Sequence, residues 1–286
     1  MQRIDIDIDI NLNGRKTLTR GTGLMNQAVQ LEIEGPVATV TLNRPDRMNA
    51  MNDTLLDGLL EALEQVASDP EVAVMILTGN GRAFCAGGDL TSMSDGLGQL
   101  PRETAVSSLR RHARASEILR TMPAVTISAV NGACAGAGLG LAAATDLRIA
   151  SEKAVFRVAF LGAAMSGDFG TAWLLTGLLG EAKTRELYLL DEKVGAEEAQ
   201  RIGLVSQVYG PDELVKEARA IADRIAVSAP LARAGIKANL NEASTVSLSE
   251  AIRRESVRHI TCGYSEDAAE AGKAFLERRV PVFMGS

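Results

Sequence analysis

An uncharged stretch in the middle of the chain limits the possible folds most. From Met122 to Thr145 no side chain carries a charge, and the composition changes partway through. The residues up to Val130 are rich in β-branched side chains, whereas "NGACAGAGLGLAAATD" (131–146) consists mostly of glycine and alanine. A buried strand followed by a tight turn and a buried helix explains this change, and one membrane-spanning helix does not.

The glycines of this stretch fit neither a membrane helix nor a phosphate-binding loop. Three of them fall four residues apart, as in packed membrane helices, but Pro123 and Asn131 interrupt the apolar window. The order Gly-x-Gly-x-Gly lacks the third position of the dinucleotide fingerprint, and no Gly-Lys-Ser/Thr follows. We therefore expect a strand, a turn and a helix whose first free amides favour negative charge.

A second glycine-rich turn follows an earlier strand candidate. "AVMILTG" (73–79) precedes "GRAFCAGGDL" (81–90), which has too many glycines for a helix. Glycine at such junctions serves packing just as often as ligand binding. If both turns direct amides at one point, however, they form an oxyanion hole, in which each donor contributes roughly 3 kcal/mol to stabilising a developing negative charge.

The rest of the chain alternates strand and helix patterns and then becomes helical. "VQLEIEGPVATVTLNRP" (29–45) predicts a hairpin, and leucines at helical spacing predict a helix behind Asn52 or Asp53. This alternation favours an α/β fold with parallel strands. We expect an N-terminal extension over 1–28, an α/β core over 29–225 and a helical region over 226–286. The alternating "IDIDIDINLN" indicates either a strand or a partly ordered extension.

Composition narrows the class of protein. The 286 residues carry a net charge of −6, so the chain lacks the basic excess of a nucleic-acid-binding protein. Three cysteines and two histidines form no cluster with metal-ligand spacing, and an odd cysteine count favours a reducing compartment. The N-terminus shows no apolar segment behind a basic start. We expect a cytoplasmic protein with no bound metal and no membrane or nucleic-acid partner.

Four motifs together resemble the crotonase superfamily, the enoyl-CoA hydratase/isomerase family. They are "VATVTLNRPDRMNAMN", "GRAFCAGGDL", "NGACAGAGLGLAAATDLRIA" and "RELYLLDEKVGAEEAQRIGLVSQV", in the order and spacing of the family. The resemblance implies a spiral of β-β-α units and a C-terminal helical region used in trimerisation, giving a homotrimer or a dimer of trimers. It also implies an acyl-CoA thioester as substrate, with no further cofactor.

The resemblance also assigns candidate site residues. By motif position, the backbone amides of Gly88 and Ala137 would hold the enolate oxygen; the family usually has glycine at the second position, and the N–H survives the change to alanine. The positions matching the coenzyme A and substrate site are Arg47, Met48, Ala86, Asp89, Leu90 and Phe160. Arg47 as a solvated turn residue and Leu90 as a core residue remain open alternatives.

The acid and base depart from the hydratase pattern. Gly140 and Phe160 stand where the family's hydratases carry two glutamates, and neither side chain can transfer a proton. Asp168, before the helical "GTAWLL", matches the aspartate of several isomerases of the superfamily and of its halobenzoyl-CoA dehalogenase. An aspartate before a helix can also be only an N-cap. Apolar neighbours in sequence, including Phe160, Met165, Phe169 and Trp173, would raise its pKa toward that of a useful base.

These observations predict an enzyme that isomerises or hydrates an enoyl-CoA, with isomerisation favoured because one carboxyl suffices for an allylic proton shift. Hydrolytic or dehalogenase-like chemistry on another acyl-CoA remains an alternative, and so does a non-catalytic acyl-CoA-binding protein. Cys85 and Cys134 lie inside the motifs, but no histidine is near them in sequence, so we expect them to pack rather than react.

Overall fold

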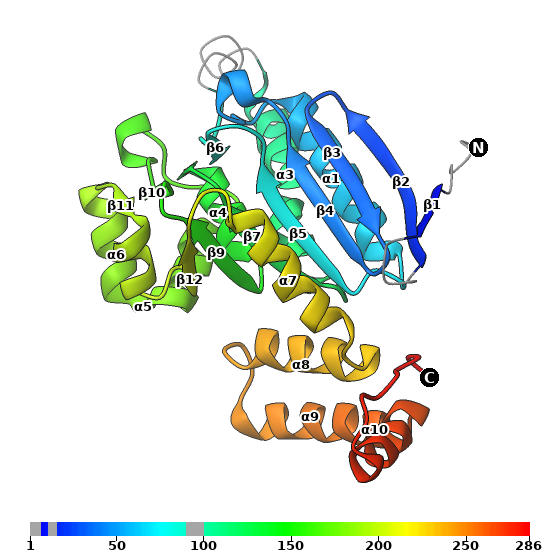
Figure 1. The fold of residues 1–286 in the computed structure, drawn as a ribbon. Helices are drawn as coiled ribbons and strands as arrows, with labels where there is room; N and C mark the ends of the chain where they lie inside the picture. The colour runs from blue at the N-terminus through cyan, green and yellow to red at the C-terminus, as the bar shows by residue number, and fades with distance from the viewer. Residues whose placement is uncertain (1–6, 11–15, 90–99) are drawn as a thin grey trace.

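The computed structural model describes residues 7–10, 16–89 and 100–286, and side chains from residue 26 onward. Among these residues a mixed sheet of eight strands forms the centre of the fold (Figure 1). Its strands, in spatial order, are β1 (Asp7–Ile10), β2 (Lys16–Asn26), β3 (Val29–Glu34), β4 (Val37–Leu42), β5 (Val74–Gly79), β7 (Val125–Val130), β9 (Leu147–Ser151) and β12 (Gln207–Tyr209). The strands from β4 to β12 are parallel, and those from β1 to β4 are antiparallel.

A smaller sheet lies beside the first. Its strands are, in order, β11 (Val194–Gly195), β10 (Val155–Arg157), β8 (Ala133–Ala135) and β6 (Ala83–Cys85). Each of β5, β7 and β9 is followed by one short strand of this sheet and then by a helix: α3 (Arg102–Thr121), α4 (Ala137–Ala144) or α5 (Thr171–Leu190). This repeated β-β-α unit is the predicted crotonase-like architecture.

The periodic segments fold as the sequence predicts. β3 and β4 form the hairpin, paired from Val29 with Leu42 to Glu34 with Val37. Helix α1 (Asp53–Ser68) begins behind Asn52, whose side-chain oxygen accepts a hydrogen bond from the N–H of Leu55 at 3.1 Å. The leucines of α1 are buried in the main core, so this helix is held by its apolar face.

The two faces of the main sheet are covered differently. The larger core cluster lies among the sheets and helices α1, α3, α4 and α5. On the other face α7 (Leu214–Ala226) packs against β5, β7 and β9 through Leu214, Ala218 and Ala222, which are spaced four residues apart. The sheet-packed helices therefore continue to Ala226. A short helix, α6 (Ala196–Arg201), precedes β12.

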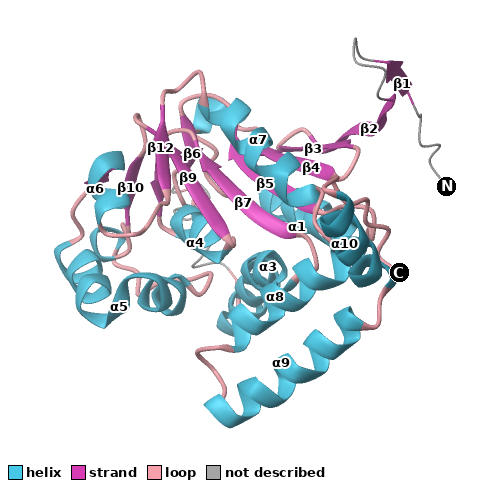
Figure 2. Cartoon of the chain, turned by 60° about the horizontal axis from the view of Figure 1, so that its bottom comes forward, coloured by secondary structure: helices cyan, strands magenta, loops and turns pink. Residues whose placement is uncertain are grey.

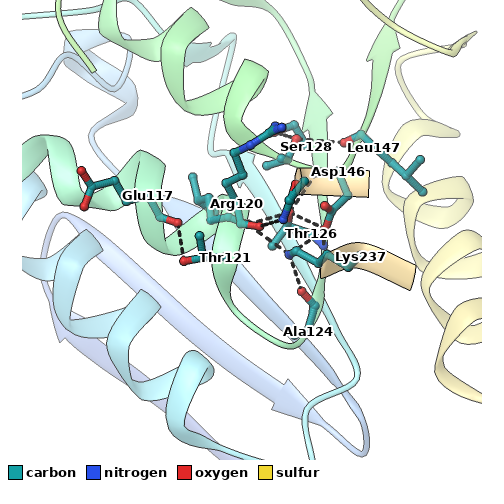
Figure 3. A network of polar contacts seen from close by, with 12 residues as sticks. Glu117, Arg120, Thr121, Ala124, Thr126, Ser128, Asp146, Leu147 and Lys237 are labelled. Carbon is teal, nitrogen blue, oxygen red and sulfur yellow. Dashed lines mark hydrogen bonds and ion pairs between the residues drawn. The ribbon is translucent and has the colours of Figure 1, made fainter. Parts of the chain in front are cut away.

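Beyond α7, three helices lie below the sheet in Figure 1: α8 (Pro230–Glu242), α9 (Leu248–Gly263) and α10 (Glu266–Glu277). Figure 2 shows α8 alongside α3, with α9 farther from the sheet. Lys237 of α8 anchors this region (Figure 3). Its ammonium group donates to the carbonyls of Leu119 at 3.2 Å and Ala124 at 2.8 Å, and it pairs with Asp146 at 2.8 Å. Asp146 also accepts from the N–H and hydroxyl of Thr126.

The N-terminal alternation does form a strand over Asp7–Ile10, which pairs antiparallel with β2. The remainder of "IDIDIDINLN" lies outside the described residues. β2, which the sequence analysis does not predict, joins β1 to the hairpin and extends the main sheet. Among the described residues, no helix has the length and apolarity needed to cross a membrane.

Candidate active site

The two glycine-rich turns meet at the ends of parallel strands. β6 and β8 pair in parallel, so the turns that follow them leave the same edge of the small sheet. Gly87 and Gly136 both have positive φ, 94° and 54°, and their backbones are in contact. A Cβ added to Gly136 would lie 3.7 Å from the Cα of Gly87. The two turns are therefore in contact, and the positive φ of each residue favours glycine at both positions.

One candidate amide belongs to each turn. The N–H groups of Met51 and Asp89 donate to the carbonyls of Gly87 (2.8 Å) and Met51 (2.9 Å), a parallel bridge that directs the N–H of Gly88 away from Met51. Ala137 is the first residue of α4, so its N–H has no acceptor within the helix. Two backbone donors are thus positioned at the meeting point of the turns.

The residues expected to contact coenzyme A cluster beside these turns. Asp89 is buried, and its carboxylate accepts from Arg44 at 3.0 Å, so this carboxylate fixes the "NRPDRMNA" segment. The N–H of Ala86 donates to the carbonyl of Met48 at 3.0 Å, which ties the same segment to the turn. Arg47 is exposed and Met48 half-buried. Leu90 lies outside the described residues.

The carboxyl group of Asp168 does not cap α5. The N-cap residue is Gly170, with no side-chain cap bond. The N–H and hydroxyl of Thr171 both donate to the backbone carbonyl of Asp168, at 3.0 and 2.8 Å. The capping interpretation of this aspartate is therefore wrong, and its side chain is available for another role.

Asp168 is half-buried, and one oxygen of its carboxyl is fully enclosed. Among the described residues its Oδ1 atom has no hydrogen-bond partner, and burial raises its pKa from 3.8 to about 6. The predicted direction of this shift is confirmed. Phe160 and Phe169 are buried, but Met165 and Trp173 are 43% and 54% exposed. Trp173 stacks under Arg120, with its ring centroid 5.0 Å from the guanidinium carbon.

Gly140 is packed against the turn that carries Asp168. A Cβ on Gly140 would lie 2.4 Å from the hydroxyl oxygen of Thr171 and 3.1 Å from the Cβ of Phe169. The residues after Asp168 occupy the space that any side chain at position 140 would need. The packing of Gly140 against Thr171 and Phe169 therefore leaves no room for a glutamate at position 140, and it also holds the turn that carries Asp168.

Tyr188, which the sequence analysis misses, lies beside Asp168. Its ring stacks on that of Phe160, with centroids 6.0 Å apart and an interplanar angle of 25°. Its hydroxyl oxygen would be 3.6 Å from a Cβ on Gly167, the neighbour of Asp168. Within the helical segment "RELYLL" a tyrosine gives no functional signal; only the folding of α5 brings it to the site.

The motif cysteines are inert thiols in this environment. Cys85 and Cys134 are fully buried, and burial raises the pKa of Cys85 to about 12 and that of Cys134 well above its usual value. The Cys85 thiol donates to the carbonyl of Asn49 at 3.1 Å. No group of three or more histidine, cysteine, aspartate or glutamate side chains in the described part of the chain could hold a metal ion.

Comparison of the sequence with known proteins identifies the same family as the motifs do. The family model for enoyl-CoA hydratase/isomerase matches residues 32–286. The 1,2-epoxyphenylacetyl-CoA isomerase of Escherichia coli is 36% identical over 91% of this chain and 100% of its own. The short-chain-enoyl-CoA hydratase of Clostridium acetobutylicum is 34% identical over 88% and 95% of the two chains.

A solved structure has the same fold. The enoyl-CoA hydratase from Bacillus anthracis superposes with a TM-score of 0.86 at 29% identity, covering 91% of this chain and all of the other. The family match spans both glycine-rich turns, the Asp168 segment and the C-terminal helices. The chain therefore belongs to the enoyl-CoA hydratase/isomerase family of the crotonase superfamily.

Proposed function

We propose that the protein isomerises an enoyl-CoA thioester through an enolate held by the N–H groups of Gly88 and Ala137, with Asp168 as the single acid and base. The enclosed Oδ1 atom of Asp168, which has no hydrogen-bond partner among the described residues, carries this proposal. Coenzyme A would lie along Arg47, Met48, Ala86, Asp89 and Leu90, with Phe160 against the acyl group. The thioester is the substrate, and no further cofactor takes part.

In this mechanism Asp168 transfers one proton between two carbons. For a 3-enoyl-CoA, the carboxylate takes a proton from the α carbon, and the electron pair passes to the thioester oxygen between the two amides. Collapse of this dienolate takes a proton from the Asp168 carboxyl at the γ carbon and leaves a 2-enoyl-CoA, and between the two steps the carboxyl can exchange its proton with the solvent. A pKa of about 6 suits both steps, because the group is ionised at neutral pH and still a competent acid.

The named relatives include both an isomerase and a hydratase, so their names do not choose between the two reactions. The residues at the acid and base positions of this chain do. Gly140 and Phe160 supply no second carboxyl, which favours isomerisation over hydration by two glutamates. A non-catalytic acyl-CoA-binding protein would have no use for a buried carboxylate that costs stability. Hydrolytic or dehalogenase-like chemistry would also use Asp168, but without moving a double bond.

The C-terminal helices favour a homotrimer or a dimer of trimers. They expose large apolar side chains, each more than half accessible: Ile236, Leu240, Ile252, Val257, Ile260, Phe275 and Leu276. Apolar surface of this extent is typical of subunit interfaces. Sedimentation equilibrium should give at least three times the 30.2 kDa chain mass, and a monomer at micromolar concentration would contradict the assembly.

The test compares isomerisation of a panel of 3-enoyl-CoAs by the wild type, Asp168→Asn and the exposed control Asp212→Asn. General acid and base catalysis contributes roughly 10² to 10⁴ in rate, so Asp168→Asn should lose about 10³ in kcat while Asp212→Asn retains wild-type activity. Equal activity of all three proteins, or equal inactivity with intact CoA binding, would overturn the mechanism.

A further inference from the structure

Three buried polar side-chain atoms near the start and end of α5 lack hydrogen-bond partners among the described residues. They are Oδ1 of Asp168, the hydroxyl of Tyr188 and the hydroxyl of Thr184. Thr184 and Tyr188 are one helical turn apart, so they share a face of α5. Leaving a buried polar atom without a partner costs roughly 1 to 3 kcal/mol, and native structures contain few of them. Their concentration here indicates a place built to bind polar atoms of a ligand.

Tyr188 is held so that its hydroxyl lies beside Asp168. Its ring rests on Phe160, and its oxygen is close to Gly167, where a Cβ would lie only 3.6 Å away. The negative charge of Asp168 and burial together raise the pKa of Tyr188 to about 12. The phenol is therefore protonated at neutral pH and acts as a hydrogen-bond donor.

A hydrogen-bond donor and an acceptor that lie close together, both without partners among the described residues, favour a ligand of particular chemistry. The Asp168 carboxylate accepts hydrogen bonds, and the Tyr188 phenol donates one. A hydroxyl group satisfies both, because it donates to the carboxylate and accepts from the phenol. A plain hydrocarbon chain satisfies neither and leaves both groups buried without partners.

A hollow of about 350 Å³ runs along α5 on the side of Tyr188. Thr184 and Tyr188 line it together with Ala172, Thr176, Glu181, Arg185 and Leu189. Tyr188 thus borders both the hollow and the turn that carries Asp168. The hollow offers room for an acyl group beside Tyr188, with the Thr184 hydroxyl one helical turn away.

We propose that Tyr188 is a specificity-determining residue, which together with Asp168 binds a hydroxyl group on the acyl chain, so that the protein prefers oxygen-bearing acyl-CoA thioesters over their hydrocarbon counterparts. This inference rests on the proposed function, because it requires the acyl group to lie beside Asp168. Asp168 keeps its role in proton transfer, and Tyr188 determines which acyl groups bind well there.

Calorimetric titration with three thioesters tests the proposal without depending on turnover. Butyryl-CoA is the hydrocarbon probe, and 3-hydroxybutyryl-CoA and 4-hydroxybutyryl-CoA carry the hydroxyl at two positions. Wild type should bind one of the hydroxylated probes at least about tenfold more tightly than butyryl-CoA, as one or two hydrogen bonds supply. Tyr188→Phe keeps the ring on Phe160, and should reduce that preference to less than twofold while leaving butyryl-CoA affinity within twofold of wild type.

The control is Tyr264→Phe, which removes the hydroxyl of a tyrosine that is 89% exposed and should retain the preference. A wild type without any preference, or a Tyr188→Phe variant that keeps it, would overturn the inference and leave the Asp168 mechanism untouched. Failure of the wild type to bind any of the three thioesters would instead overturn the proposed function, and this inference with it.

Discussion

Asp146 and Asp168 flank the β9–β10 unit, one before it and one after it, and their surroundings are opposite. Asp146 accepts hydrogen bonds from Thr126 and pairs with Lys237 (Figure 3), so its charge is matched on every side that the structure describes. Asp168 has a buried oxygen with no partner among the residues that the structure describes, and burial raises its pKa to about 6.

The difference separates a structural carboxylate from a reactive one. A matched carboxylate stabilises the fold. An unmatched one destabilises the fold and is available to take a proton from a substrate. Substitutions around Asp146 should therefore affect mainly stability, and substitutions around Asp168 should also affect catalysis.

The largest stability effect is expected for Asp146→Asn. It leaves the buried ammonium of Lys237 without its counter-charge, which should lower the free energy of unfolding by about 3 kcal/mol, or roughly 150-fold in the unfolding equilibrium. Urea denaturation measures this loss, while kcat should stay within threefold of wild type. The control Asp223→Asn breaks an exposed pair with Arg219 and should cost less than about 1 kcal/mol. Equal losses of stability in the two variants would show that the pair of Asp146 with Lys237 contributes no more than an exposed ion pair.

Gly140→Ala should come next, with about 2 kcal/mol lost. The new Cβ would overlap the hydroxyl of Thr171 in a closely packed region and displace the turn that holds Asp168, so kcat should fall as well. Gly177→Ala is the matched control, because nothing lies within 4 Å of its added Cβ and alanine favours the helix. A Gly140→Ala protein with wild-type stability and activity would show that this packing does not position Asp168.

The pH dependence of kcat should show a smaller effect. Only the ionised form of Asp168 can take a proton, so kcat should fall as the pH drops through about 6, reaching about a tenth of its plateau near pH 5. A pH–rate profile between 4.5 and 8.5 measures the midpoint. A midpoint near 4, the ordinary value for an aspartate, would mean that burial does not raise this pKa.

The smallest effect is a gain in stability in Asp168→Asn. Because the folded pKa exceeds the ordinary 3.8, the folded state binds more protons between about pH 4 and 6, and its stability falls as the pH rises through that range. Asparagine avoids this loss, so the variant should be more stable than wild type by about 1 to 2 kcal/mol at pH 8, with the gain shrinking toward pH 4. A less stable variant at pH 8 would indicate that the carboxylate has partners.

The sequence predicts the parts of this fold that repeat over many residues. The hairpin of β3 and β4, helix α1 and the strands β5 and β7 all show clear periodicity or apolar runs. The short strands β6 and β8 were not predicted, because three residues show no periodicity and their pairing joins segments about 50 residues apart. Those two strands nevertheless bring the glycine-rich turns together.

The site was predicted only in part for a similar reason. Motif position leads to Asp168, Gly88 and Ala137, but sequence leaves open whether the carboxyl caps a helix. That question depends on Thr171 binding the backbone carbonyl of Asp168 and on Gly170 forming the cap. Tyr188 comes from 20 residues farther along α5 and reaches the site only through the packing of that helix.

Proton exchange from the solvent tests the central claim most directly, because it measures the proton transfer assigned to Asp168 whatever the product is. Incubation of 3-enoyl- and 2-enoyl-CoA thioesters in D₂O, followed by NMR, reports deuterium at the α and γ carbons. We expect wild type to introduce deuterium at these carbons and Asp168→Asn to do so about 10³ times more slowly. Exchange at the same rate in both proteins would contradict Asp168 as the acid and base.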